Sequence, residues 1–139
     1  MVRSVAAIAI ASFIGIISLP SLAQQRQTPT PNRQGDYNSA ITTFPDGSQA
    51  ILLSWFTNIR SGKLNCRSAP GVNQRVIKQF KPNDLLQVNA GAKNSQEPIM
   101  RDSQGNPWLR VKIVNNQGKT QGNCFVRANR QFIEPNSLE

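Results

Sequence analysis

The two cysteines constrain this chain of 139 residues more than any other feature of its sequence. Cys66 lies within residues 64–68 and Cys124 within residues 123–126, two short runs typical of strands, and each shares a face with its apolar neighbours. We therefore expect one disulfide inside the core, closing a loop of 59 residues from 66 through 124. A free or regulatory thiol pair and an intermolecular bond are the alternatives.

Residues 1–23 have the pattern of an export signal. Arg3 precedes a charge-free, mostly apolar run over 5–19, and a small-residue cleavage pattern ends at Ala23. The run is shorter than the roughly 20 apolar residues that a membrane-spanning helix needs, so an uncleaved anchor is the weaker interpretation. We expect an exported, periplasmic or extracellular protein with no membrane insertion after cleavage and with conditions that favour disulfides.

Removing residues 1–23 leaves 116 residues, enough for one domain, with a formal charge of +8 because Arg3 is lost. A cationic surface speeds encounters with acidic partners such as anionic glycans or cell-wall carboxylates. The alternative is a solvated surface that only maintains solubility.

The chain changes character near residue 50. Residues 24–49 are rich in Gln, Asn, Thr and Pro and predict a flexible polar leader that ends in a turn at 44–47. Short apolar runs then alternate with Gly, Pro and Asn clusters, which indicates an all-β domain over 50–135 and a tail over 136–139. The run 51–56 is also compatible with a short helix. The predicted strands are 50–58, 62–67, 76–80, 85–90, 108–114, 123–127 and 132–134, with turns at 68–73, 81–84, 103–107 and 115–119.

Period-two alternation assigns the faces of these strands. One face is expected to form the core: Leu64, Cys66, Leu109, Val111, Ile113, Cys124 and Val126. The opposite face interleaves cations with aromatic rings, which suits contact with a polar ligand. On it we expect the ligand-binding residues Arg67, Trp108, Arg110, Phe125 and Arg127, beside Asn65 and Lys112. The alternatives are that Trp108 packs at one end of the core and that the arginines are merely solvated.

The order of these elements resembles a bacterial SH3-like (SH3b) domain over about residues 62–135. The family's opening Leu-Asn-x-Arg-Ser-x-Pro-Gly is matched by residues 64–71, its tryptophan strand by Trp108-Leu109-Arg110-Val111, and its closing segment by Cys124-Phe125-Val126 with Phe132-Ile133. The chain departs from the family in its two cysteines, in Phe125 where tryptophan is usual, and in the long connection 89–107.

The resemblance implies a small half-open β-barrel of about five to seven short strands. It also implies a monomeric, non-catalytic module that binds cell-wall peptides or another envelope component. The alternative is a protein-binding adaptor or inhibitor in the cell envelope.

Catalysis has little support in this sequence. There is no histidine, so triads that need a histidine base are excluded, and the seven carboxylates are scattered. Two sulfurs without histidine cannot complete a zinc site, and residues 102–106 lack the distal acid of a calcium loop. We expect neither metal nor cofactor.

The positive charge also suggests an alternative function, nucleic-acid binding through a basic aromatic surface. Export argues against this alternative, so no nucleic acid is expected as partner.

Overall fold

The expected alternation of apolar and polar residues is realised in an all-β fold. The computed structural model describes residues 26–137, so the predicted export signal over 1–23 lies outside the described residues. No helix occurs between residues 26 and 137, which confirms the all-β prediction and excludes the helical alternative for 51–56. The strands are β1 (Ile41–Thr43), β2 (Gln49–Ile51), β3 (Ser54–Thr57), β4 (Leu64–Arg67), β5 (Val76–Phe80), β6 (Leu85–Gln87), β7 (Ile99–Arg101), β8 (Pro107–Val114), β9 (Thr120–Arg127) and β10 (Ile133–Pro135).

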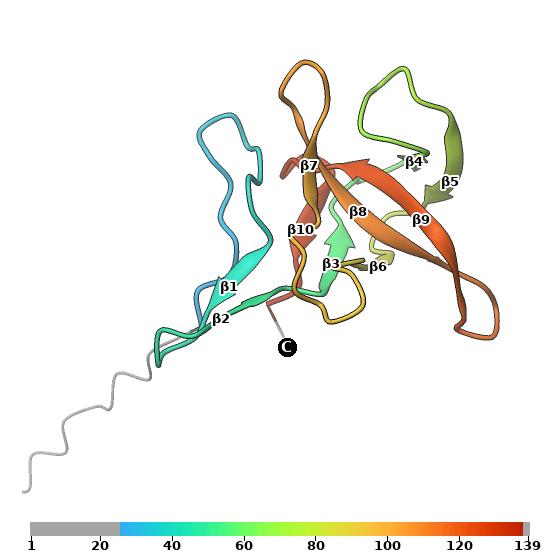
Figure 1. The fold of residues 1–139 in the computed structure, drawn as a ribbon. Helices are drawn as coiled ribbons and strands as arrows, with labels where there is room; N and C mark the ends of the chain where they lie inside the picture. Colours follow the sequence, from blue (N-terminus) through green and yellow to red (C-terminus); the bar gives the residue numbers. More distant parts are fainter. Residues whose placement is uncertain (1–25, 138–139) are drawn as a thin grey trace, which may run out of the picture.

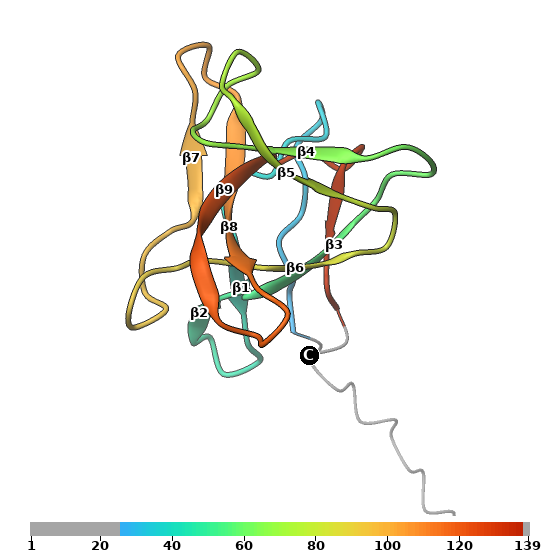
Figure 2. The ribbon, with the colours of Figure 1, turned by 90° about the vertical axis from the view of Figure 1, so that its right-hand side faces the viewer.

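The strands form three antiparallel sheets, none of them closed. Their orders are β1-β2, β10-β3-β6 and β5-β4-β9-β8-β7. A bridge between Val88 and Val111 joins the end of β6 to β8 and so connects the two larger sheets. Figure 2 looks into the interior that β3, β4, β6, β8 and β9 surround, and Figure 1 shows the β1-β2 hairpin to one side of it.

The core fills this interior. Six of the seven side chains predicted on the inward face are buried: Leu64, Cys66, Leu109, Val111, Cys124 and Val126. Ile113, the seventh, is partly buried and packs against the others. Trp55 is fully buried among them, and its indole Nε1 donates a hydrogen bond to the Leu52 carbonyl at 3.2 Å. The ring of Tyr37 meets Trp55 edge-on at a centroid distance of 4.9 Å.

The predicted disulfide is confirmed. Cys66 of β4 is bonded to Cys124 of β9, with Cα atoms 5.3 Å apart, and both residues are fully buried. The bond therefore joins two neighbouring strands inside the core. A buried disulfide of this kind is typical of proteins that fold outside the cytoplasm.

Most strand predictions hold, and the exceptions have physical reasons. The single strand expected over 50–58 is wrong, because β2 and β3 belong to different sheets. Between them the chain crosses the core, where Leu52 is buried and its amide donates to the Ala40 carbonyl. Strand β7 lies within the connection 89–107, where no strand was predicted. The four predicted turns are present, as is the turn at 44–47, where the Gly47 amide donates to Phe44.

The flexible leader predicted over 24–49 is wrong from residue 26 onward. This part of the chain contains β1 and packs Tyr37 and Ala40 into the core. Gly35 is buried with φ of +88°, and a Cβ at that position would come within 3.0 Å of the Arg130 side chain. The folded domain therefore begins no later than residue 26. The start of the predicted C-terminal tail is also attached, because the Asn136 side chain donates to Ser54 Oγ at 2.9 Å.

Candidate ligand-binding groove

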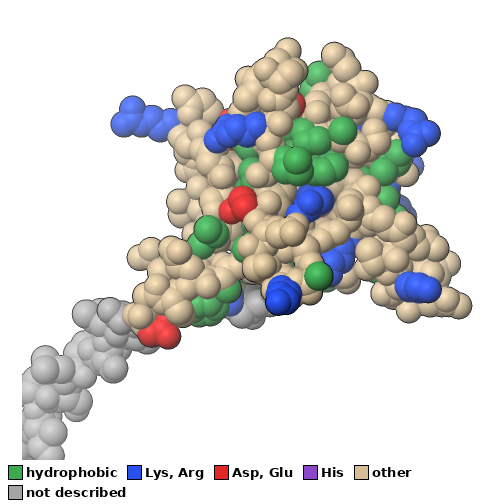
Figure 3. Space-filling view, in the orientation of Figure 1, with side chains coloured by type: hydrophobic (Ala, Val, Ile, Leu, Met, Phe, Trp, Pro, Cys, Tyr) green, Lys and Arg blue, Asp and Glu red, His purple; other side chains and the backbone are tan. Residues whose placement is uncertain are grey.

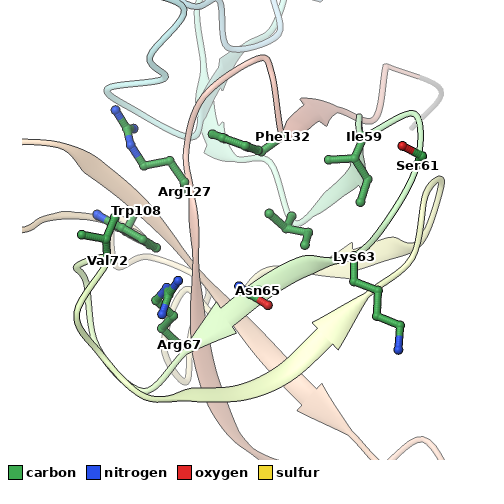
Figure 4. A pocket seen from close by; sticks show the side chains of 10 residues that line it. Ile59, Ser61, Lys63, Asn65, Arg67, Val72, Trp108, Arg127 and Phe132 are labelled. Atoms are coloured by element: carbon green, nitrogen blue, oxygen red, sulfur yellow. The ribbon is translucent and has the colours of Figure 1, made fainter.

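A groove of about 530 Å³ lies where one end of the five-stranded sheet meets the β3–β4 loop and the segment before β10. Figure 4 shows Phe132 and Ile59 on one side of it, Trp108 and Val72 on another, and Asn65 and Arg67 along its base. Its walls come from the β3–β4 loop, from β4, from the β4–β5 turn, from the start of β8, from the end of β9 and from the segment before β10. The lining residues are Ile59, Ser61, Lys63, Leu64, Asn65, Arg67, Val72, Trp108, Arg127 and Phe132.

The strand register explains how the predicted ligand-binding residues are arranged. Trp108 of β8 is opposite Arg127 of β9, and Phe125 of β9 is opposite both Arg110 of β8 and Arg67 of β4. All five therefore occupy the same face of three adjacent strands. Only Arg67, Trp108 and Arg127 line the groove, whereas Arg110 and Phe125 do not.

Trp108 forms a wall of the groove rather than an exposed platform. Its side chain is only 3% exposed, and its indole Nε1 donates to Asp102 Oδ2 at 2.9 Å. Partial desolvation acts to raise the pKa of Asp102, but hydrogen bonds from Trp108, Asn106 and Gln104 outweigh it and hold that pKa below its ordinary value. Residues 102–106 thus form the tight turn that leads into β8 and fixes the indole.

The three predicted arginines each hold a neighbouring segment of backbone. Arg67 Nη1 donates to the Gln74 carbonyl at 2.8 Å, and Arg110 Nε donates to the Asn89 carbonyl at 2.9 Å. Arg127 Nη1 donates to the Pro107 carbonyl at 2.9 Å, while its Nη2 pairs with Asp36. These contacts give the arginines a structural role that strand alternation does not reveal.

Sequence reasoning missed the groove residues that come from loops. Ile59 and Val72 lie outside the predicted and the observed strands, so period-two alternation carries no information about them. Lys63 and Phe132 fall within the strands predicted over 62–67 and 132–134 but immediately precede β4 and β10, and neither was predicted to bind ligand. The half-buried ring of Phe132, not Phe125, is the second aromatic group of the groove.

The groove is lined by three cations and by no carboxylate. Within residues 26–137 the Lys63 ammonium has no hydrogen-bond or ion-pair partner, and Arg127–Asp36 is the one ion pair. Most carboxylates of this region serve as acceptors for nearby donors of the chain: Asp36, Asp46, Asp84, Glu97 and Asp102. The basic side chains are therefore largely left without an internal counter-charge. Figure 3 shows several of them spread over one face, where acidic side chains are few.

The described residues show no group of three or more His, Cys, Asp or Glu side chains placed to hold a metal ion. They also contain no helix long and apolar enough to cross a membrane.

Comparison of the chain with family models, with curated proteins and with solved structures finds no match.

Proposed function

We propose that this protein is a non-catalytic binding module that recognises a component of the cell envelope, with cell-wall peptidoglycan as the leading ligand. The observation that carries this proposal is the groove, in which apolar walls stand beside cations and no carboxylate is present. Grooves that combine apolar surface with a few placed polar groups are typical of ligand sites.

The groove suits a ligand that carries both a carboxylate and an apolar part. Lys63 and the remaining donors of Arg67 attract the carboxylate, since charge-assisted hydrogen bonds to carboxylates are among the strongest available. Ile59, Val72 and Phe132 cover the apolar part. Peptides of the bacterial wall have this composition, and the order of motifs that resembles an SH3b domain supports the same conclusion.

A location outside the cytoplasm is consistent with a ligand in the cell wall. The disulfide indicates a compartment outside the cytoplasm, and the pattern of residues 1–23 supplies a route to it. After cleavage the protein acts as a monomer in the periplasm or outside the cell.

The test is a pull-down of the mature protein with purified peptidoglycan at low and at moderate salt. We expect retention at both, and retention at neither overturns the proposal for the wall. Lys63→Glu and Phe132→Ala should each weaken retention several-fold. Lys119→Glu is the matched control, because it makes the same charge change at an exposed position in the β8–β9 turn. Indifference to wall material together with one co-purifying polypeptide would favour the adaptor or inhibitor alternative.

A further inference from the structure

Exposed apolar side chains are frequent in the segment of the chain that contains β5. Six large hydrophobic residues of the described chain are exposed, and four of them lie between positions 72 and 85: Val72, Val76, Ile77 and Leu85. Val76 and Ile77 are each 38% exposed and belong to β5, while Leu85 opens β6. Exposed apolar side chains gathered in one region mark interaction sites more often than scattered ones do.

The backbone of β5 is available on one side. β5 is the edge strand of its sheet and pairs only with β4. An edge strand directs part of its N–H and C=O groups away from the sheet, where a further strand can pair with them. Val76 is opposite Arg67, and Ile77 alternates with Lys78, which is opposite Cys66. A register shift at this point therefore leaves Val76 and Ile77 on the same face, the one that Arg67 occupies. An added strand would therefore find both apolar contacts on one face, and Figure 1 shows β5 at the outside of the molecule.

The charge around β5 selects the kind of strand that fits. Arg75, Lys78 and Lys81 lie on or beside it, and the sequence has no Asp or Glu between Asp46 and Asp84. The Asp84 carboxylate is occupied by the backbone amide of Lys81, at 2.7 Å. Two copies of β5 placed edge to edge would bring these cations together, and like charges across strands are destabilising.

We propose that β5 is a docking edge for an extended, acidic segment of a partner protein, which adds to the sheet as a sixth strand. Main-chain hydrogen bonds to β5 provide affinity in this mode of recognition, and alternate side chains provide specificity. Glutamate or aspartate residues of the partner face Arg75, Lys78 and Lys81, and its apolar residues cover Val76 and Ile77. This inference does not depend on ligand binding in the groove, with which the region shares only Val72.

The probe is a blocked peptide of alternating valine and glutamate, compared with the same peptide in which lysine replaces glutamate. With isotopically labelled mature protein, we expect the acidic peptide to shift the amide resonances of residues 76–80 and to slow their hydrogen exchange. The basic peptide should leave them unchanged. Equal effects of both peptides, shifts confined to other strands, or no shift at millimolar peptide would overturn the proposal. Self-association that protects β5 would instead assign the edge to a second copy.

Variants separate this surface from the groove. Arg75→Glu with Lys78→Glu should weaken binding of the acidic peptide about tenfold at low salt, since two weakly attractive exposed ion pairs become repulsive. Lys93→Glu with Lys119→Glu makes the same charge change at two exposed loop positions and should leave affinity unchanged. Phe132→Ala, which damages the groove, should also leave peptide binding intact. Equal weakening by both double variants would show that net charge alone drives binding.

Discussion

Arg127 Nη2 lies 2.7 Å from Asp36 Oδ1, although 91 positions separate the two residues in the sequence. The same carboxylate oxygen accepts a hydrogen bond from Asn129 Nδ2 at 2.8 Å. Both members of the ion pair are largely shielded, with side chains 20% and 17% exposed. This contact ties the first described residues to the end of β9, and it makes that segment part of the domain.

Asp36→Asn removes the charge of this pair but keeps an amide of similar shape. We expect the free energy of unfolding to fall by about 1–3 kcal/mol, because the partly buried guanidinium loses its charged acceptor. Urea unfolding at neutral pH measures the change. Glu134→Gln, at an exposed position, is the control and should stay within about 0.5 kcal/mol of the parent protein. Equal stability of the two variants would contradict a structural role for the pair.

Loss of the disulfide should have the largest effect. Replacing both Cys66 and Cys124 by alanine frees a loop that spans a sequence separation of 58, for which the chain-entropy model gives about 4 kcal/mol. Chemical denaturation should give the same free energy of unfolding for the double variant and for the parent protein in the presence of reductant. Thiol titration of the parent protein in denaturant without reductant should find no free thiol. Two titratable thiols would refute the bond.

Thr57 connects β3 to the turn between β5 and β6. Its fully buried hydroxyl donates to the Lys81 carbonyl at 2.6 Å and accepts from the Asp84 amide at 2.9 Å. Thr57→Val keeps the shape but leaves both backbone groups without this partner, so we expect a loss of about 1–3 kcal/mol in thermal or urea unfolding. Thr57→Ser keeps the hydroxyl and should lose less. A serine variant as unstable as the valine variant would show that packing, not hydrogen bonding, matters here.

The turn at Asp102 should make stability depend on acid pH. Its pKa in the folded protein is lowered, despite partial desolvation, by hydrogen bonds from Trp108, Asn106 and Gln104. A carboxyl whose folded pKa is below its unfolded value of about 3.9 adds stability above that pH and loses it as pH falls through the folded pKa. Asp102→Asn should therefore be less stable than the parent protein at pH 6, and the difference should shrink at pH 3. A difference of the same size at both values would rule out this charge effect.

The sequence predicts the parts of this fold that depend on local periodicity. Strand β5 begins and ends where the strand predicted over 76–80 does, and the inward faces of β4, β8 and β9 follow from alternation alone. Alternation cannot distinguish an arginine that contacts ligand from one that anchors a neighbouring segment. Arg67, Arg110 and Arg127 consequently appear as surface residues in the sequence, and their backbone acceptors are visible only in the structure.

The ordered N-terminal segment escapes prediction for a related reason. Its polar composition is typical of disorder, yet its polar groups find partners far away in the chain. Glu97 accepts from Ser39 Oγ and from the Ala40 amide, and Arg101 Nη2 donates to Asn38 Oδ1. These partners are about 60 positions distant, and no local pattern encodes such pairings. Lys63 and Phe132 likewise come to line one groove only through the tertiary fold.

The covalent bond between Cys66 and Cys124 has a mechanical consequence for recognition. It locks β4 and β9, the strands that carry Asn65, Arg67 and Arg127, so neither can slide past the other. A molecule entering the groove meets a rigid base, and only side chains on the surrounding loops must become ordered. Preorganisation of this kind lowers the entropic cost of association.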